Sequence, residues 1–373
     1  MAAPAPVKPS LAATLPLELQ RRIVSHHMVS VIDPLHFRTL RAICLISKAW
    51  LAVGREFLYK KLFFDWIITV NIPKLVEALR LHAHLRIFTR AAKLATDMWG
   101  KHKINPILDL FPALPNLREV EVWSQDEHVD RLVAALEQMP HLTVATLHCE
   151  LSPRLTMVLY DLENLAILEI WNSFTDPGIE PKFRLKGLLL AEPCTRDSFE
   201  LLTASSRETL MHIGICGDDT EDPMDLSPFH RVQHVYLFPP EPAAFDPDSV
   251  AAYVDAVIAS ARDLPELVTI SLADSQRERG RCWDEFQPND AWLLDEVPPS
   301  LKYLDLSAAE ASFDPEHIIE YVANAEHSPK LERLRLRNDA IWAEDKGGLE
   351  AVAKERGVEL LWMRDRGEEC LIC

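Results

Sequence analysis

A short motif recurs along this chain: proline, any residue, leucine, two residues of any kind, and then apolar residues separated by one position. It occurs seven times, whereas a chain of this composition should contain about one such match by chance. Proline ends a helix and favours an extended residue before it, so the motif predicts places where a helix gives way to a strand. Five matches predict strand entries and two fall in helical patterns; they begin at Pro115, Pro140, Pro265, Pro299 and Pro329, and at Pro106 and Pro153.

Without its proline, the pattern Leu-x-x-apolar-x-apolar is expected about 40 times by chance in a chain that is 48% hydrophobic. The pattern is informative through the spacing between its matches. Successive first positions lie 20 to 35 residues apart, which leaves room for a helix between strands. The ten predicted strand lines are Leu117, Val120, Val122; Leu142, Ala145, Leu147; Leu165, Leu168, Ile170; Leu185, Leu188, Leu190; Leu210, Ile213, Ile215; Val232, Val235, Leu237; Leu267, Ile270, Leu272; Leu301, Leu304, Leu306; Leu331, Leu334, Leu336; and Val358, Leu361, Met363.

Helix signals lie between these lines. Ser152, Asp246 and Asp314 each precede a proline, which is typical of a helix cap followed by the first helical residue. Two apolar stripes have helical spacing: Val129, Leu132, Val133 and Leu136, and Val250, Val254, Val257, Ile258 and Ala261. We therefore expect residues 63–373 to form an irregular α/β solenoid, with a curved, mostly parallel sheet and helices on its outer side.

The N-terminal part has a different pattern. Residues 1–12 are rich in Ala and Pro and are expected to be disordered. Residues 13–62 predict several short helices: Thr14 is a candidate cap, and Asp33-Pro34 starts a second helix. The apolar residues of this segment are too few for a core of normal size, so we expect a neighbour or a partner to complete it.

Five separated groups in this segment resemble an F-box: Leu15-Pro16-x-Glu18-Leu19, Ile23, Asp33-Pro34, Ile46-Ser47-Lys48-x-Trp50 and Leu58-Tyr59-x-x-Leu62. The stretch between Val24 and Thr39 is longer than in the family pattern. Residues 63–373 resemble the degenerate leucine-rich repeats that follow F-boxes, especially in fungal proteins.

The resemblance implies the substrate-recognition subunit of a Skp–cullin–F-box ubiquitin ligase, which acts in ubiquitin-dependent degradation. The module would bind the Skp adaptor, and through it a cullin, while the repeats bind a target protein. Carried over from the family, the adaptor contacts are Leu15, Pro16, Leu19, Ile23 and Leu45. Two alternatives remain open. In one, Leu15, Leu19, Ile23, Leu40 and Trp50 merely form a small helical core; in the other, the module only caps the solenoid of a non-catalytic interaction scaffold.

On a solenoid, the outward positions of the strands form the concave face. Aromatic and arginine side chains carry much of the binding energy at protein interfaces. They occupy outward positions here, so the target-binding candidates are Trp123, Trp171, Tyr236, Phe238, Tyr303, Arg335, Arg337 and Trp362. One alternative is that the rings cover the next turn or pack under loops. For Arg333, Arg335 and Arg337, selection of an acidic segment stands against a solvated edge strand that carries charge.

Other classes of function find little support. The net charge of −18 disfavours nucleic acid as the main partner. The sequence has no Gly-rich phosphate loop, no G-x-S-x-G and no H-E-x-x-H, so we expect neither an enzyme nor a cofactor or metal. Seven scattered cysteines and the lack of a long apolar segment predict a cytoplasmic or nuclear protein without a transmembrane segment. Cys370 begins a C-terminal C-a-a-X sequence, a possible lipidation site whose alternative is an unmodified tail.

Overall fold

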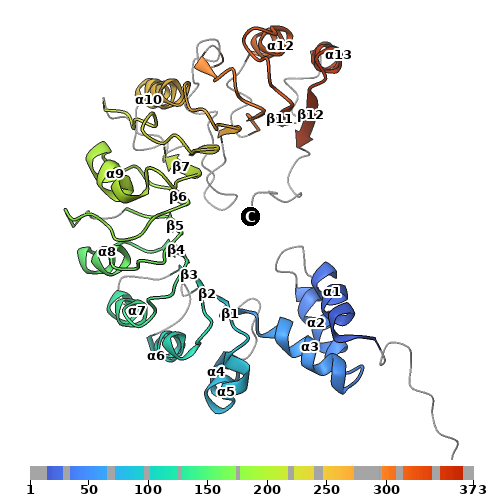
Figure 1. Ribbon diagram of the computed structural model, residues 1–373, viewed down its shortest axis with the longest axis vertical. Helices are drawn as coiled ribbons and strands as arrows, with labels where there is room; N and C mark the ends of the chain where they lie inside the picture. Colours follow the sequence, from blue (N-terminus) through green and yellow to red (C-terminus); the bar gives the residue numbers. More distant parts are fainter. Residues whose placement is uncertain are drawn as a thin grey trace, which may run out of the picture. The chain divides into compact units, whose positions relative to one another are not determined.

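The computed structural model describes residues 15–27, 34–64, 72–95, 101–123, 128–173, 177–216, 222–238, 247–272, 294, 296–307, 314–337 and 345–363. None of the helices in these ranges is both long and apolar enough to cross a membrane. Contacts divide the chain into two compact units, Met1–Ala145 and Thr146–Cys373. In each unit, parallel strands follow one another in chain order, with helices between them (Figure 1).

The first unit begins with the helices α1, α2 and α3 and continues with three strands. Its elements are α1 (Leu17–His27), α2 (Pro34–Cys44), α3 (Lys48–Leu58), β1 (Lys61–Phe64), α4 (Ile72–Leu81), α5 (Ala83–Arg86), β2 (Ala91–Ala95), α6 (Lys101–Leu108), η2 (Phe111–Ala113), β3 (Glu119–Trp123) and α7 (Val129–Leu136). The strand β4 (Val144–His148) contains the boundary between the units. Strands β1, β2 and β3 pair in parallel, with Leu62 opposite Ala92 and Ala92 opposite Val120.

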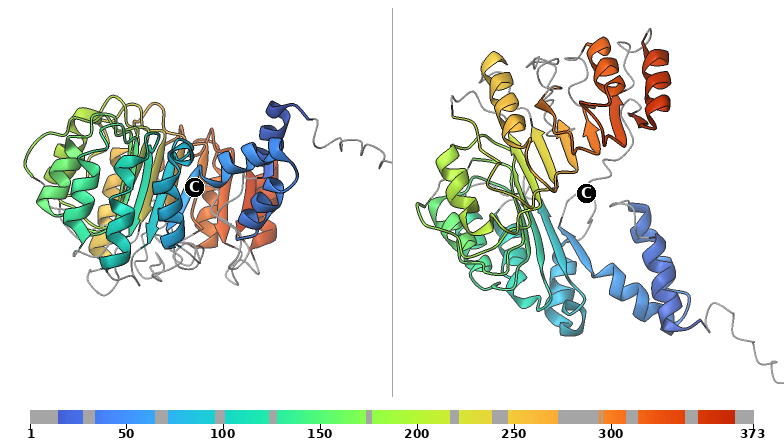
Figure 2. Two further views of the ribbon diagram at one scale, coloured as in Figure 1. Left: turned by 90° about the horizontal axis from the view of Figure 1, so that it is seen from below. Right: turned by 45° about the horizontal axis from the view of Figure 1, so that its top comes forward.

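The second unit repeats the same strand-and-helix pattern. Its elements are α8 (Pro153–Tyr160), β5 (Ile167–Ile170), β6 (Gly187–Leu190), α9 (Arg196–Thr203), η4 (Ala204–Ser206), β7 (His212–Cys216), β8 (His234–Phe238), α10 (Pro247–Ser260), β9 (Thr269–Leu272), β10 (Tyr303–Asp305), α12 (Pro315–Ala323), β11 (Arg333–Arg337), α13 (Lys346–Arg356) and β12 (Glu359–Met363). Strands β5 to β12 form a continuous parallel sheet. The helices of this unit lie on the outer side of its curved row of strands (Figure 1, Figure 2).

The same backbone contact starts most strands. The carbonyl oxygen of the residue just before a strand accepts two hydrogen bonds, of 2.7–3.2 Å, from consecutive N–H groups at the entry of the next strand. These shared acceptors fix the parallel register wherever they occur. They belong to Lys60, Arg90 and Arg118 in the first unit, and to Ala166, Lys186, Met211, Gln233, Val268 and Lys302 in the second.

Nine of the ten strand lines are confirmed. Their template residues are buried, none being more than 6% exposed, and they form the core between the strands and the helices. The prolines of the five strand-entry motifs lie in turns two residues before a buried leucine. These features are those of the α/β leucine-rich-repeat fold, a solenoid of parallel strands backed by helices.

The tenth line is wrong by one residue. Strand β12 pairs with β11 so that Leu360 lies opposite Leu334 and Trp362 lies opposite Leu336. Both partners are buried core residues, so the inward set of this strand is Val358, Leu360 and Trp362, not Val358, Leu361 and Met363. Four consecutive apolar residues, Leu360 to Met363, made the alternation ambiguous in the sequence.

The pattern also missed two strands, β1 and β2. In both, the leucine position of the template holds another residue: Tyr59 precedes Leu62 and Phe64, and Thr89 precedes Ala92 and Leu94. Thr89 is fully buried and occupies the place of the usual leucine. The first strand begins at Lys61, so Leu62, expected to close the helical module, lies in the sheet.

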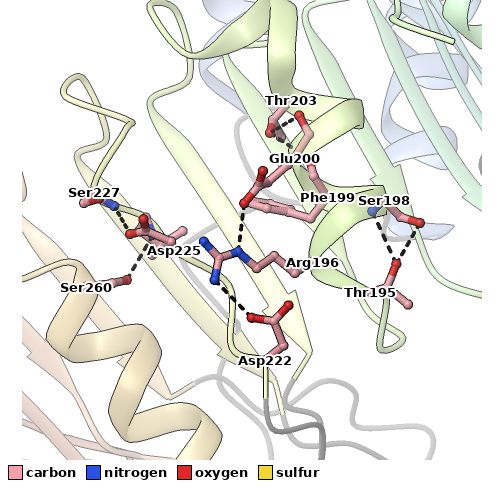
Figure 3. A network of polar contacts seen from close by, with 11 residues as sticks. Thr195, Arg196, Ser198, Phe199, Glu200, Thr203, Asp222, Asp225, Ser227 and Ser260 are labelled. Atoms are coloured by element: carbon pink, nitrogen blue, oxygen red, sulfur yellow. Dashed lines mark hydrogen bonds and ion pairs between the residues drawn. The ribbon is translucent and has the colours of Figure 1, made fainter. Parts of the chain in front are cut away.

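Helix caps agree with the sequence where they are described. Ser152 Oγ accepts a hydrogen bond from Leu155 N–H at the start of α8, and an Asp314 carboxylate oxygen accepts one from Glu316 N–H at the start of α12. Thr195 Oγ1 likewise caps α9 by accepting a backbone hydrogen bond. Arg196, the next residue, forms ion pairs with Glu200 and Asp222 at 2.8 and 3.0 Å (Figure 3). This cluster ties α9 to the segment leading into β8. The positions of Thr14, Asp33 and Asp246 lie outside the described residues.

Candidate protein-interaction surfaces

The helices α1 to α3 enclose a small core. Val24, Leu40, Trp50 and Val53 are each at most 4% exposed. Leu15, Ile43, Phe57 and Leu58 pack around them and are partly buried. Ser47 Oγ caps α3 by accepting from Trp50 N–H, and Arg21 pairs with Glu56 at 3.0 Å to join α1 to α3.

Most of the apolar residues assigned to adaptor binding are not part of this core. Leu19 is 45% exposed, Ile23 is 40% exposed, and Leu45, in the turn between α2 and α3, is 86% exposed. Ile46 beside it is 49% exposed. We call Leu19, Ile23, Leu45 and Ile46 the module surface. The alternative core of Leu15, Leu19, Ile23, Leu40 and Trp50 is therefore right for Leu15, Leu40 and Trp50 and wrong for Leu19 and Ile23.

The other two predicted contacts have mixed roles. Leu15 packs against the core of the module, and its carbonyl oxygen accepts a hydrogen bond of 2.7 Å from the Gln20 side chain. Pro16 is exposed and its carbonyl oxygen accepts from Gln20 N–H. These bonds fix the first turn of α1, so this turn holds Leu19 outward.

The second candidate surface is the open face, which we define as the sheet face opposite the buried template residues. In the first unit, Trp123 lies here at the end of β3. Its indole N–H donates to Glu121 at 3.0 Å, and the Lys93 ammonium lies 5.4 Å from its ring centroid while pairing with Glu121. Trp123 is thus an aromatic side chain held in one orientation.

In the second unit, an aromatic cluster occupies one end of the open face. Trp171, just after β5, stacks on His148 with centroids 5.1 Å apart and lies 6.4 Å from the ring of Phe238. Gly214 makes room for this ring: a Cβ at position 214 would lie 2.9 Å from Phe238 Cε2. A larger residue in β7 would therefore displace Phe238 from the sheet.

Beside this cluster stand three parallel rings. His212 of β7 stacks on His234 of β8 with centroids 4.6 Å apart, and His234 is nearly parallel to Tyr236 at 6.5 Å. His234 Nδ1 lies 3.1 Å from Thr269 Oγ1 of β9. Burial lowers the pKa of both histidines, and the neighbouring imidazole lowers the pKa of His234 further. Both rings are therefore neutral at pH 7.

At the other end of the open face the charges are paired. The Asp305 carboxylate of β10 is 3.4 Å from the Arg335 guanidinium of β11, and it also accepts two hydrogen bonds from Ser307. Arg333 pairs with Glu359 at 2.9 Å. Tyr303 lies between Thr269 and Arg333 in the same row. The Arg337 backbone belongs to β11, whereas its side chain lies outside the described residues.

Trp362 is a correction to the predicted target-binding set. Its register opposite Leu336 places it on the face that carries the buried template residues. Lys346, at the start of α13, lies 4.5 Å from its ring centroid, which agrees with a position under that helix. Cys370 lies outside the described residues.

The sequence prediction also missed residues of the open face. His212 and His234 were not among the candidates, although each precedes the fourth template position, Ile213 or Val235, by one residue. The two-residue alternation of a strand therefore contained the signal. Their pairing across β7 and β8 depends on the register, which the sequence does not reveal because 22 residues separate them.

Comparison with known proteins adds a likeness in structure. No family model and no curated protein matches this sequence. Among solved structures, the chain is similar to the leucine-rich-repeat-containing protein LegL7 from Legionella pneumophila, with 12% identity and a TM-score of 0.45, over 75% of this chain and 92% of that one. Among the described residues, no group of three or more His, Cys, Asp or Glu side chains is arranged to hold a metal ion.

Proposed function

We propose that this protein is a substrate receptor of a Skp–cullin–F-box ubiquitin ligase. The module surface binds the Skp adaptor, and the open face of the repeats binds the target. The observation that carries the proposal is the outward position of Leu19, Ile23 and Leu45, because the module core is complete without them. Apolar side chains that a small domain leaves in water are typical of a site that a partner covers.

The energetics of docking follow from this exposure. Burying a leucine or isoleucine side chain contributes about 1.5–3 kcal/mol. Three such side chains contribute about 4.5–9 kcal/mol at most, which is of the same order as the loss of motional freedom on association, so a stable complex also needs the surrounding contacts of the module. A carboxylate at any of these positions would be buried without a partner on binding, whereas in the free protein it stays in water.

The test is co-purification with a Skp adaptor. We expect the wild-type chain to form a stoichiometric complex, and Leu19→Asp and Leu45→Asp each to raise the dissociation constant at least tenfold. Leu81→Asp is the matched control, because Leu81 is an exposed leucine, 71% accessible, at the end of α4 outside the module. Wild-type binding that survives both module substitutions would refute the assignment of the site.

A scaffold function is the second candidate, and one observation favours it. The Lys60 carbonyl, directly after α3, accepts hydrogen bonds from Arg90 and Ala91 N–H at the entry of β2. The module thus continues directly into the first strand pair, as a cap of the repeats does. If the wild-type chain fails to bind any Skp adaptor in solution, the capping role alone remains.

A further inference from the structure

The middle of the open face in the second unit carries no charged side chain at its described positions. In β6 to β9 these positions are Gly187, Leu189, His212, Gly214, Cys216, His234, Tyr236, Phe238, Thr269 and Ser271. The chain as a whole has 57 acidic and 39 basic residues, so an uncharged stretch of this length stands out. Its accessible members are Leu189, His212, His234 and Tyr236, and the other six positions are buried. Glu169 of neighbouring β5 accepts a hydrogen bond of 3.1 Å from Thr146.

The three parallel rings provide neutral polar edges. A neutral imidazole has one N–H donor and one acceptor nitrogen. His234 Nδ1 already pairs with Thr269 Oγ1, so His234 offers its Nε2, and His212 both of its nitrogens, to the N–H and C=O groups of a peptide backbone. Gly187 of β6 and Thr269 of β9 flank them in the same row. Farther along this row, beyond Tyr303, the charged residues Arg333 and Glu359 are paired with each other.

The aromatic cluster provides the apolar part. Trp171 is partly exposed and forms a ledge beside the stack; it lies against Phe238, which is only 6% exposed and fills the space above Gly214. The Trp171 indole N–H is buried and has no hydrogen-bond acceptor among the described residues. A side chain lying on this ledge would lose its water, which favours an uncharged ring or aliphatic group.

We propose that this central stretch binds an extended, uncharged peptide segment of the target, with an aromatic or branched aliphatic side chain on the Trp171 ledge. The proposal rests on the proposed function, since it names the chemistry of the target. A charged residue in the middle of the segment would be desolvated without a partner. Protonation of the stacked histidines would place two like charges side by side and release the segment.

The probe is a phage-displayed library of random dodecapeptides, selected against the full-length chain at pH 7.5. We expect enriched peptides to lack Asp, Glu, Lys and Arg in their central part and to contain an aromatic or branched aliphatic residue there. Replacing that residue with Asp or Lys should weaken binding at least tenfold. Enrichment of charged peptides, or of none, overturns the proposal.

Substitutions locate the site. Trp171→Ala and Tyr236→Ala should each weaken an enriched peptide at least tenfold, while Met157→Ala, an exposed residue of α8, should leave binding unchanged. Because an alanine at 171 can disturb packing, Tyr236→Phe serves as a milder variant, and thermal unfolding confirms that each protein is folded. Binding that is equal in wild type and the three open-face variants excludes this site.

The pH dependence tests the histidines. Affinity should fall at least tenfold between pH 7.5 and pH 4.5 in the wild type, because burial lowers the pKa of both histidines, and less than threefold in the double variant His212→Gln, His234→Gln, which keeps polar edges without a titrating group. An equal fall in both proteins removes the histidines from the mechanism. The selection uses no adaptor, so loss of adaptor binding by itself would refute the ligase function and leave the peptide site standing.

Discussion

Asp255 lies in α10 and is 5% exposed, although it carries a carboxyl group. Its Oδ1 has no hydrogen-bond partner among the described residues. Burial and then the nearby Glu296 carboxylate raise its pKa from 3.8 to about 7. In the unfolded chain the group ionises at its ordinary pKa, so between about pH 4 and pH 7 the folded state binds more protons than the unfolded state. The second unit must therefore lose stability as the pH rises through this window.

Asp255→Asn removes this titration. We expect the variant to be more stable than the wild type at pH 8 by about 2 kcal/mol and to differ little from it at pH 4, since one pKa unit corresponds to ~1.4 kcal/mol and relaxation reduces the full effect. Urea unfolding at both pH values measures the difference. Asp263→Asn, an exposed residue just after α10, is the control. A stabilisation that is equal at both pH values would show that Asp255 is already ionised when buried.

Gly54 in α3 is a second residue at which the structure leaves no room for a larger side chain. A Cβ at this position would lie 2.5 Å from Cys44 Sγ of α2 and 3.4 Å from the Cys44 backbone nitrogen. Gly54→Ala should destabilise the helical module by about 1–3 kcal/mol through overpacking. Gly347→Ala in α13 is the matched control, because nothing lies within 4 Å of its Cβ and alanine favours a helix by up to about 1 kcal/mol. Thermal unfolding of both variants should shift in opposite directions.

At the scale of elements, neighbouring helices are joined by side-chain contacts to helix ends. Arg356, in the last turn of α13, donates to the carbonyl oxygens of Val322 and Ala323 at the end of α12, at 3.1 Å each, and to that of Ser328 at 3.0 Å. It thereby satisfies carbonyls that a helix end leaves free and places a positive charge at the negative end of the helix dipole.

Arg356→Ala should therefore weaken the packing of α13 on α12. We expect a loss of about 1–3 kcal/mol in the stability of the C-terminal repeats, seen as faster amide exchange in α12 and α13. Lys354→Ala, an exposed residue of the same helix, should change the exchange little. Unchanged exchange in the Arg356 variant would mean that water replaces the guanidinium without cost.

The strands and helices also show how much of the fold the sequence patterns could predict. Proline before a buried leucine located strand entries correctly because both residues act locally: one restricts the backbone and the other fills the core. The prediction failed where the local signal was ambiguous, at Leu360 to Met363, or where Thr89 and Tyr59 replaced the leucine. Helical spacing alone could not predict the exposure of Leu19 and Ile23, because it does not tell a core face from a docking face; only the F-box resemblance implied it.

At the scale of the whole molecule, repeats interact with their neighbours in the sheet, so a defect should stay local. Leu336→Ala in β11, a core position 1% exposed, should cost about 2–5 kcal/mol locally. Hydrogen exchange followed by mass spectrometry should show faster exchange in β10, β11 and β12 and no change in β1 to β3 of the first unit. Faster exchange in all strands would instead indicate that the chain unfolds as one cooperative body.

The shared carbonyl acceptors at the strand entries have a consequence for any partner that crosses the strands of the second unit. They hold neighbouring strands at a fixed spacing of about 4.8 Å, whatever the number of residues in the connecting helices. Side chains on one side of an extended peptide recur every ~6.7 Å. The strand spacing and the side-chain repeat of the peptide therefore coincide at about every third strand. A peptide crossing the open face would then make strong contacts at intervals, such as at β5 and again at β8, and looser ones between them.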